Sequence, residues 1–190
     1  MPLILPLAVI VIDIFLLSVV LLLCLLMITW VVSFYMDVPF VPTPSDAFPK
    51  IKQVLRLGSG DVVYELGSGD GRFLLACALR EPRARFIGIE RNPLLYTYSL
   101  FRKHLAGNPS NLTFLRASFF DIDLSGATKI YAYLLDPIMD ALLPKFEREL
   151  SHARIASRAF KFSKKDPAET LRLSEQPGSH NQHMLYVYDF

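Results

Sequence analysis

Residues Val62 to Phe73 read VVYELGSGDGRF. The apolar start predicts a buried strand that ends near Leu66, and the apolar residues after Arg72 predict a helix. Between them lies a turn of Gly67, Ser68, Gly69, Asp70 and Gly71. Its glycines have no Cβ and so permit a sharp change of direction, which leaves the free N–H groups of the first helical turn facing whatever binds there. A strand, a glycine-rich turn and a helix in this order are typical of a nucleotide-type cofactor loop.

A second strand strengthens this prediction. Residues 85–89 read RFIGI, and Glu90 follows them, 23 positions after Gly67. A carboxylate at that place can accept hydrogen bonds from both hydroxyls of a ribose. The glycines are spaced G-x-G-x-G and Arg72 follows them, so the dinucleotide fingerprint G-x-G-x-x-G is not met. The spacing therefore disfavours NAD and FAD, and a loop with only a structural role stays open as an alternative.

The loop resembles motif I of the class I S-adenosylmethionine-dependent methyltransferases. The resemblance implies that S-adenosylmethionine is the cofactor, that its methionine end lies on the turn and that Glu90 holds its ribose. The residues assigned to the methionine end are Glu65, Gly67, Ser68, Gly69, Asp70 and Gly71. Many enzymes of this class bind the adenine amino group with an Asp at the end of the third strand. Here Ser118 stands in that place and its hydroxyl can accept the same hydrogen bond, while the neighbouring Phe119 could stack on adenine or belong to the core.

The remainder of the chain alternates predicted helices and strands. The first helix, residues 45–57, is expected to be capped by Ser45 and to turn Phe48, Ile51 and Leu55 inward. Further helices are expected at 92–106 and 138–150, and further strands at 112–115, 129–135, 154–160, 170–173 and 184–189. This alternation predicts an α/β fold, a Rossmann-like methyltransferase sheet of about seven mostly parallel strands with helices on both faces. Ligands of such sheets bind beyond the carboxyl ends of the strands.

A long apolar segment lies at the N-terminus. Residues 14–36 contain no charged side chain over 23 positions, and the apolar character extends back to Pro2 with only Asp13 interrupting it. As a helix this segment would extend about 35 Å, enough to cross a hydrocarbon core of about 30 Å. A cleaved signal peptide fits poorly, because no Lys or Arg precedes the segment and no small-x-small site follows it. A buried core helix of this length is rare in a small domain, so we predict a transmembrane helix.

The chain is expected to divide into three parts: a membrane anchor at 1–36, a proline-rich linker at 37–44 and one methyltransferase domain at 45–190. Basic side chains follow the anchor, at Lys50, Lys52 and Arg56, and none precedes it. The positive-inside rule then predicts a single-pass protein whose catalytic domain lies on the cytosol-like side. The corresponding membranes are the bacterial cytoplasmic membrane and the mitochondrial inner membrane, with the domain in the matrix.

Charge and ligand types argue against other partners. The formal net charge of +2 and the pI near 8.5 come with no basic run interleaved with aromatics, so no nucleic-acid partner is expected. Two cysteines, Cys24 and Cys77, cannot form a disulfide framework and favour a reducing compartment. His180 and His183 have no Cys or acidic partner at ligand spacing, so no metal is expected.

The proline-rich segment narrows the resemblance. The combination of VPFVPTP at 38–44, ELGSGDGR at 65–72, AYLL at 132–135 and the apolar N-terminus is similar to a small family of membrane-anchored protein-lysine methyltransferases. That family includes the enzyme that modifies the c subunit of ATP synthase. The resemblance implies that Thr43 helps cover the cofactor and that the substrate is a lysine of a membrane protein. Two alternatives stay open: methylation of a lipid or quinone in the membrane, and an assembly protein that binds the cofactor without turnover.

Candidate catalytic residues lie at the end of the fourth strand. Leu135-Asp136-Pro137 is half of the Asp/Asn-Pro-Pro-aromatic motif with which many amine methyltransferases hold the acceptor nitrogen. Asp136 and Tyr133 are therefore the predicted catalytic residues. Methyl transfer to an amine needs a neutral nitrogen about 3 Å from the methyl carbon, so positioning and desolvation count for more than a nucleophilic side chain.

Overall fold

The computed structural model describes residues 4–34, 41–173 and 183–190, and the chain divides into two compact units, Met1–Phe40 and Val41–Phe190. In the first unit, α1 (Ile4–Phe34) is one helix of 31 residues. Its stretch Val9–Ile28 is long and apolar enough to cross a membrane, and none of that stretch is buried within the protein. The stretch begins before the predicted span and includes Asp13.

The second unit is built on a sheet of seven strands. They are β1 (Val62–Leu66), β2 (Arg85–Ile89), β3 (Leu112–Leu115), β4 (Lys129–Ala132), β5 (Arg154–Arg158), β6 (Glu169–Arg172) and β7 (Met184–Asp189). Their spatial order is β3-β2-β1-β4-β5-β7-β6. The first five pair in parallel, whereas β7 is antiparallel to both β5 and β6. The predicted fold class, a mostly parallel Rossmann-like sheet, is confirmed.

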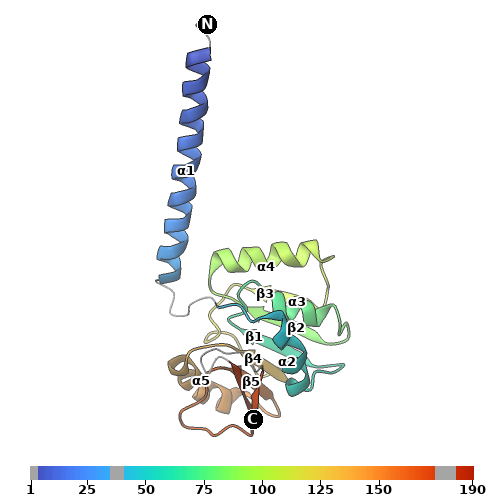
Figure 1. Ribbon diagram of the computed structural model, residues 1–190. Helices are drawn as coiled ribbons and strands as arrows, with labels where there is room; N and C mark the ends of the chain where they lie inside the picture. The colour runs from blue at the N-terminus through green and yellow to red at the C-terminus, as the bar shows by residue number, and fades with distance from the viewer. Residues whose placement is uncertain (1–3, 35–40, 174–182) are drawn as a thin grey trace. The chain divides into compact units, whose positions relative to one another are not determined.

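The helices cover both faces of this sheet. They are the short 3-10 turn η1 (Ser45–Ala47), α2 (Phe48–Leu55), α3 (Arg72–Ala78), α4 (Pro93–Leu105) and α5 (Asp136–Glu149). The crossovers through α3 and α4 step away from β1 in one direction, and the crossover through α5 steps in the other. Because parallel crossovers are right-handed, α3 and α4 lie on one face and α5 on the opposite face, as Figure 1 shows. The order reverses between β1 and β4, where such folds bind ligands.

Two predicted boundaries are wrong for local reasons. Ser45 does not cap the first helix: α2 begins at Phe48, with Ala47 at its N-cap and no side-chain cap. Pro49 in the first turn has the φ of a helix and no N–H to satisfy. The fourth strand ends at Ala132 rather than at Leu135, because its partner β1 ends opposite Ala132, where the chain turns away.

Aromatic side chains connect the helices to the sheet. Phe73 of α3 lies between Phe48 of α2 and Tyr131 of β4, with ring centroids 5.3 and 4.8 Å away. All three side chains are buried. The packing fixes the position of α2 and of the carboxyl end of β4, and both border the candidate site.

The first prediction concerns Arg154, which is only 6% exposed. Its Nε donates to the carbonyl oxygen of Val54 at 2.8 Å, its Nη1 to the Asp189 carboxylate at 2.8 and 2.9 Å, and its Nη2 to Glu169. Replacing Arg154 by methionine keeps an apolar stem but leaves these acceptors without their donor. The free energy of unfolding should fall by about 2–3 kcal/mol, measured by urea denaturation of the full chain in detergent. Arg85→Met, at an exposed position in β2, is the control, and equal losses in the two variants would contradict this account.

Candidate cofactor and active site

The glycine loop has a left-handed backbone at its three glycines and is held by backbone hydrogen bonds. Gly67, Gly69 and Gly71 have φ values of 73°, 55° and 71°, which side chains other than glycine rarely adopt. The N–H groups of Gly67 and Ser68 both donate to the carbonyl oxygen of Ile89, at 2.9 and 3.0 Å. The start of the loop is therefore attached to the end of β2.

The ring of Phe114 packs closely against the glycine loop and β2. A Cβ on Gly71 would come within 2.3 Å of the Phe114 ring, and one on Gly88 would come within 2.5 Å of the same ring. Gly71 and Gly88 are therefore also required by packing. The sequence showed these glycines but not the ring between them, because Phe114 belongs to β3, far along the chain.

Glu90 is bonded to the loop. Its Oε2 accepts from the N–H of Gly69 at 2.8 Å, and its Oε1 accepts from the N–H of Asn92 at 2.8 Å. Burial raises the pKa of the Glu90 carboxyl. Each carboxylate oxygen can accept a further hydrogen bond, so Glu90 can shape the loop and still take the ribose hydroxyls that the sequence assigns to it.

Glu65, in β1, has an unsatisfied acceptor. Its Oε2 and the Oγ of Ser68 are buried and have no hydrogen-bond partner among the described residues. Burial raises the pKa of Glu65 well above its ordinary value, and the nearby carboxylates of Asp70 and Glu90 raise it further. A buried carboxyl group with an unsatisfied acceptor, close to a second buried carboxyl group at Glu90, favours a cationic ligand. The ammonium and sulfonium groups of S-adenosylmethionine fit this requirement.

Asp70 is engaged by the helices. Its carboxylate, 4% exposed as a residue, pairs with Arg72 at 2.7 Å and Arg102 at 3.3 Å. Asp70 therefore joins the loop to α3 and α4, and its predicted contact with the cofactor stays a prediction. The partner on α4 was missed, since nothing in the local pattern indicates a contact over 32 positions.

The described part of the predicted linker, residues 41–44, is attached to the sheet. Thr43 is buried, and its Oγ1 lies 2.8 Å from the hydroxyl of Tyr131 at the end of β4. Residues 37–40 of that linker lie outside the described residues. The bond brings Thr43 to the carboxyl half of β4, and its predicted role in covering the cofactor stays a prediction.

Tyr133 and Asp136 both follow β4, although Tyr133 was expected within that strand, and their catalytic role stays a prediction. The Tyr133 ring stacks on Phe160, with centroids 6.1 Å apart, and the Arg158 guanidinium lies 4.8 Å from its centroid. Asp136 is exposed at the start of α5, and its Oδ1 accepts the backbone N–H of Lys161 at 3.1 Å. The sequence did not indicate Arg158 and Phe160, because their contribution depends on the pairing of β5 with β4.

Ser118 and Phe119 lie in the loop after β3. The Ser118 Oγ accepts the N–H of Phe120 at 3.3 Å, and the rings of Phe119 and Phe120 are 5.0 Å apart. Both predicted residues are half-buried. Their role beside an adenine stays a prediction.

The second prediction follows from the raised pKa of Glu65. A bound cation favours the carboxylate, so binding expels the proton that the raised pKa retains. Cofactor affinity should therefore rise with pH through that pKa, by up to about tenfold per pH unit, and then level off. Calorimetry with S-adenosylmethionine over a series of pH values, starting above the ordinary pKa of a glutamate, checks this. Glu65→Gln should bind more weakly and without this slope; an unchanged slope in Glu65→Gln would assign it to another group.

The order of the strands, the glycine loop after β1 and the acid after β2 together define a class I S-adenosylmethionine-dependent methyltransferase. Residues 65–169 match the sequence profile of the ANTKMT methyltransferase domain, and the chain belongs to that family. The prediction of an enzyme of this class, with S-adenosylmethionine as its cofactor, is confirmed.

Individual relatives agree with this membership. A protein-lysine N-methyltransferase of Saccharolobus islandicus is 29% identical over 82% of this chain and 96% of its own length. A lysine N-methyltransferase of Xenopus laevis, named for the c subunit of ATP synthase, is 30% identical over 65% of this chain and 54% of its own. Among solved structures, an RNA methyltransferase from Salinibacter ruber in complex with S-adenosylhomocysteine has a TM-score of 0.70 at 28% identity, over 78% of this chain and 93% of that one.

Proposed function

We propose that this chain is a membrane-anchored protein-lysine N-methyltransferase that acts on a membrane protein such as the c subunit of ATP synthase. The observation that carries the proposal is the match with the Saccharolobus islandicus enzyme, which is named for protein-lysine methylation and is covered over 96% of its length. The match to relatives named for the ATP synthase c subunit narrows the substrate class.

The site residues take roles that suit this chemistry. S-adenosylmethionine supplies an electrophilic methyl group on a positively charged sulfur. Glu65 and the loop hold its cationic end, Glu90 orients its ribose and Thr43 covers it. The rings of Tyr133 and Phe160 form an aromatic wall, beside which a substrate amine is shielded from solvent. A lysine ammonium, with an ordinary pKa of about 10.4, must lose its proton before transfer, and an apolar wall favours the neutral form.

The anchor accounts for access to such a substrate. The stretch Val9–Ile28 has the length and composition of a membrane span, and only residues 35–40 separate α1 from Val41. Six residues in any conformation hold the ends they join no more than about 25 Å apart. A domain so tethered meets lysines near the membrane surface at a raised effective concentration. The basic residues after α1 favour a domain on the cytosol-like side, the matrix in mitochondria.

Transfer of tritium from labelled cofactor into membranes tests the acceptor. The full chain should label a small membrane protein, and replacing the target lysine by arginine should remove the label, because the guanidinium stays protonated. Label recovered in an organic extract would identify a lipid or quinone as the acceptor. Nuclease-sensitive label would favour RNA, the substrate for which the Salinibacter ruber neighbour is named. Cofactor binding without any label would favour the assembly protein.

A further inference from the structure

Helix α4 carries an apolar face that the described protein leaves largely exposed. Leu94, Tyr98, Phe101 and Leu105 recur at helical spacing and lie on one side of the helix. Their exposed fractions are 46, 48, 53 and 69%. Ser99 is the one buried residue of the helix. The sequence pattern that predicts this helix therefore describes a face that the rest of the domain leaves open.

The same part of the chain is entirely free of negative charge. Residues 91–120 contain no Asp or Glu, and they include Arg91, Arg102, Lys103 and Arg116. The Arg102 guanidinium lies 5.7 Å from the centre of the Tyr98 ring, and the Tyr98 and Phe101 rings stack at 6.4 Å. The cationic groups thus border the apolar face directly.

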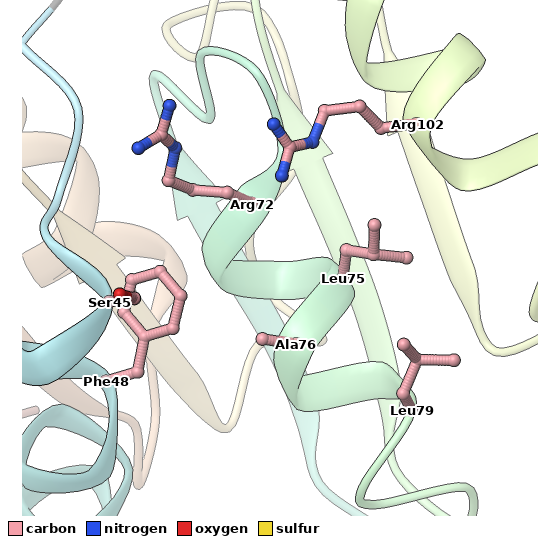
Figure 2. A pocket seen from close by; sticks show the side chains of 7 residues that line it. All are labelled: Ser45, Phe48, Arg72, Leu75, Ala76, Leu79 and Arg102. Atoms are coloured by element: carbon pink, nitrogen blue, oxygen red, sulfur yellow. The ribbon is translucent and has the colours of Figure 1, made fainter. Parts of the chain in front are cut away.

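A groove continues this face toward α3 and α2. It has a volume of about 430 Å³. Figure 2 shows the guanidinium groups of Arg72 and Arg102 at the same end of the groove. The apolar side chains along its length come from Phe48, Leu75, Ala76 and Leu79, and Ser45 also lines it. The two guanidinium groups share the single carboxylate of Asp70. One positive charge therefore remains unbalanced at an end of an otherwise apolar groove.

We propose that the outer face of α4 and this groove dock on the surface of an anionic bilayer. The exposed side chains of α4 enter the boundary between headgroups and acyl chains, and Arg72 and Arg102 bind a phosphate of an anionic lipid. The inference rests on the anchoring proposed above, because the tether of six residues keeps the domain within reach of the surface. It adds a second contact, which orients the domain on the membrane.

The chemistry of the face favours lipid over other occupants. Nucleic-acid interfaces are polar and strongly positive, whereas Leu94, Phe101 and Leu105 present hydrocarbon. An amphipathic helix with aromatic and aliphatic residues on one face and Lys and Arg beside them is typical of a membrane interface. Each basic group near an anionic surface adds attraction that salt screens. A second copy of this chain would bring the same positive charges against these, which is unfavourable.

A fluorophore at position 105 tests the docking in the full chain. Leu105→Cys is labelled in a Cys24→Ser background; Cys77 is buried and burial raises the pKa of its thiol to about 12, so it does not react. The protein is placed in nanodiscs of phosphatidylcholine with phosphatidylglycerol and a headgroup nitroxide. Emission from the label at position 105 should fall by roughly half, because an interfacial helix lies at the depth of the headgroup nitroxide. The same label at Arg83→Cys, exposed before β2, should lose almost nothing.

Further measurements distinguish lipid from a second copy of the chain and from nucleic acid as the occupant of the α4 face. Quenching at 105 should weaken in phosphatidylcholine alone, in high salt, and in Phe101→Ser/Lys103→Gln. It should not weaken in Lys164→Gln, which removes one exposed charge near α5, away from this face. Equal quenching at 105 and 83 would overturn the docking, as would quenching indifferent to anionic lipid. A blue shift in detergent that grows with protein concentration would assign the face to a second copy, and one caused by RNA would assign it to nucleic acid.

Co-flotation with liposomes tests the membrane anchor separately. A chain that floats without quenching at 105 contradicts the docking and leaves the proposed function standing. A chain that does not float contradicts both the docking and the membrane anchor.

Discussion

Replacing Gly71 by alanine should lower the free energy of unfolding by about 2–4 kcal/mol and weaken cofactor binding at least about tenfold. Two effects add. The left-handed backbone at φ 71° costs a residue with a Cβ about 1 kcal/mol, and the new methyl group would lie 2.3 Å from the buried Phe114 ring, an overpacking that costs about 1–3 kcal/mol. Denaturation of the full chain in detergent and calorimetry with S-adenosylmethionine measure the two losses.

Gly60 provides the matched control for this variant. Its φ is 86°, and a Cβ there would meet nothing within 4 Å. Gly60→Ala should therefore lose only the part of the free energy of unfolding that comes from the left-handed backbone, about 1 kcal/mol. It should bind the cofactor normally. Adding Phe114→Leu to Gly71→Ala should restore part of the lost affinity by making room. Equal destabilisation by the two alanines would show that the Phe114 contact is unimportant.

Removing the carboxylate of Glu90 should have a comparably large effect on cofactor binding. Glu90→Ala leaves the N–H groups of Gly69 and Asn92 without their acceptor and removes the group that takes the ribose hydroxyls. The two ribose hydroxyls lose a charged acceptor, at about 1.5–3 kcal/mol for each hydrogen bond, which gives a reduction in affinity of about a hundredfold or more. The unmatched N–H groups lower the free energy of unfolding as well. Glu90→Gln keeps one oxygen acceptor and should be intermediate.

The control for Glu90 is Glu147→Ala, since Glu147 is exposed on α5. It should leave the affinity for S-adenosylmethionine unchanged. Calorimetry on the three variants decides the matter. If Glu90→Ala bound the cofactor as tightly as Glu147→Ala, the carboxylate would serve the packing of the loop and not the cofactor.

The loop that decides the fold could be predicted because its signals are local. A strand, three glycines at fixed spacing and a helix follow one another within residues 62–78, and the structure shows them in that order. The alternation of elements likewise predicted a mostly parallel sheet. The order of its strands and the antiparallel place of β7 were not predicted, because they depend on contacts between segments far apart in the sequence.

The residues of the candidate site likewise divide into those that the local sequence predicts and those that it does not. Glu65 and Glu90 stand at strand ends that the sequence marks. Arg102, Phe114 and Arg158 come to the site from other elements, and a single sequence records no such pairing. The apolar pattern of α4 predicted a helix but not its environment, since periodicity shows that one face is apolar without showing what covers it.

The most direct test of the central claim is the intact mass of small membrane proteins in cells that carry the gene, lack it, or carry the Glu90→Ala variant. We predict that one such protein is heavier by whole methyl increments only in cells with the unaltered gene, and that fragmentation places the added mass on a lysine. Identical masses in all three, together with a methylated lipid, quinone or RNA that depends on the gene, would contradict protein-lysine methylation.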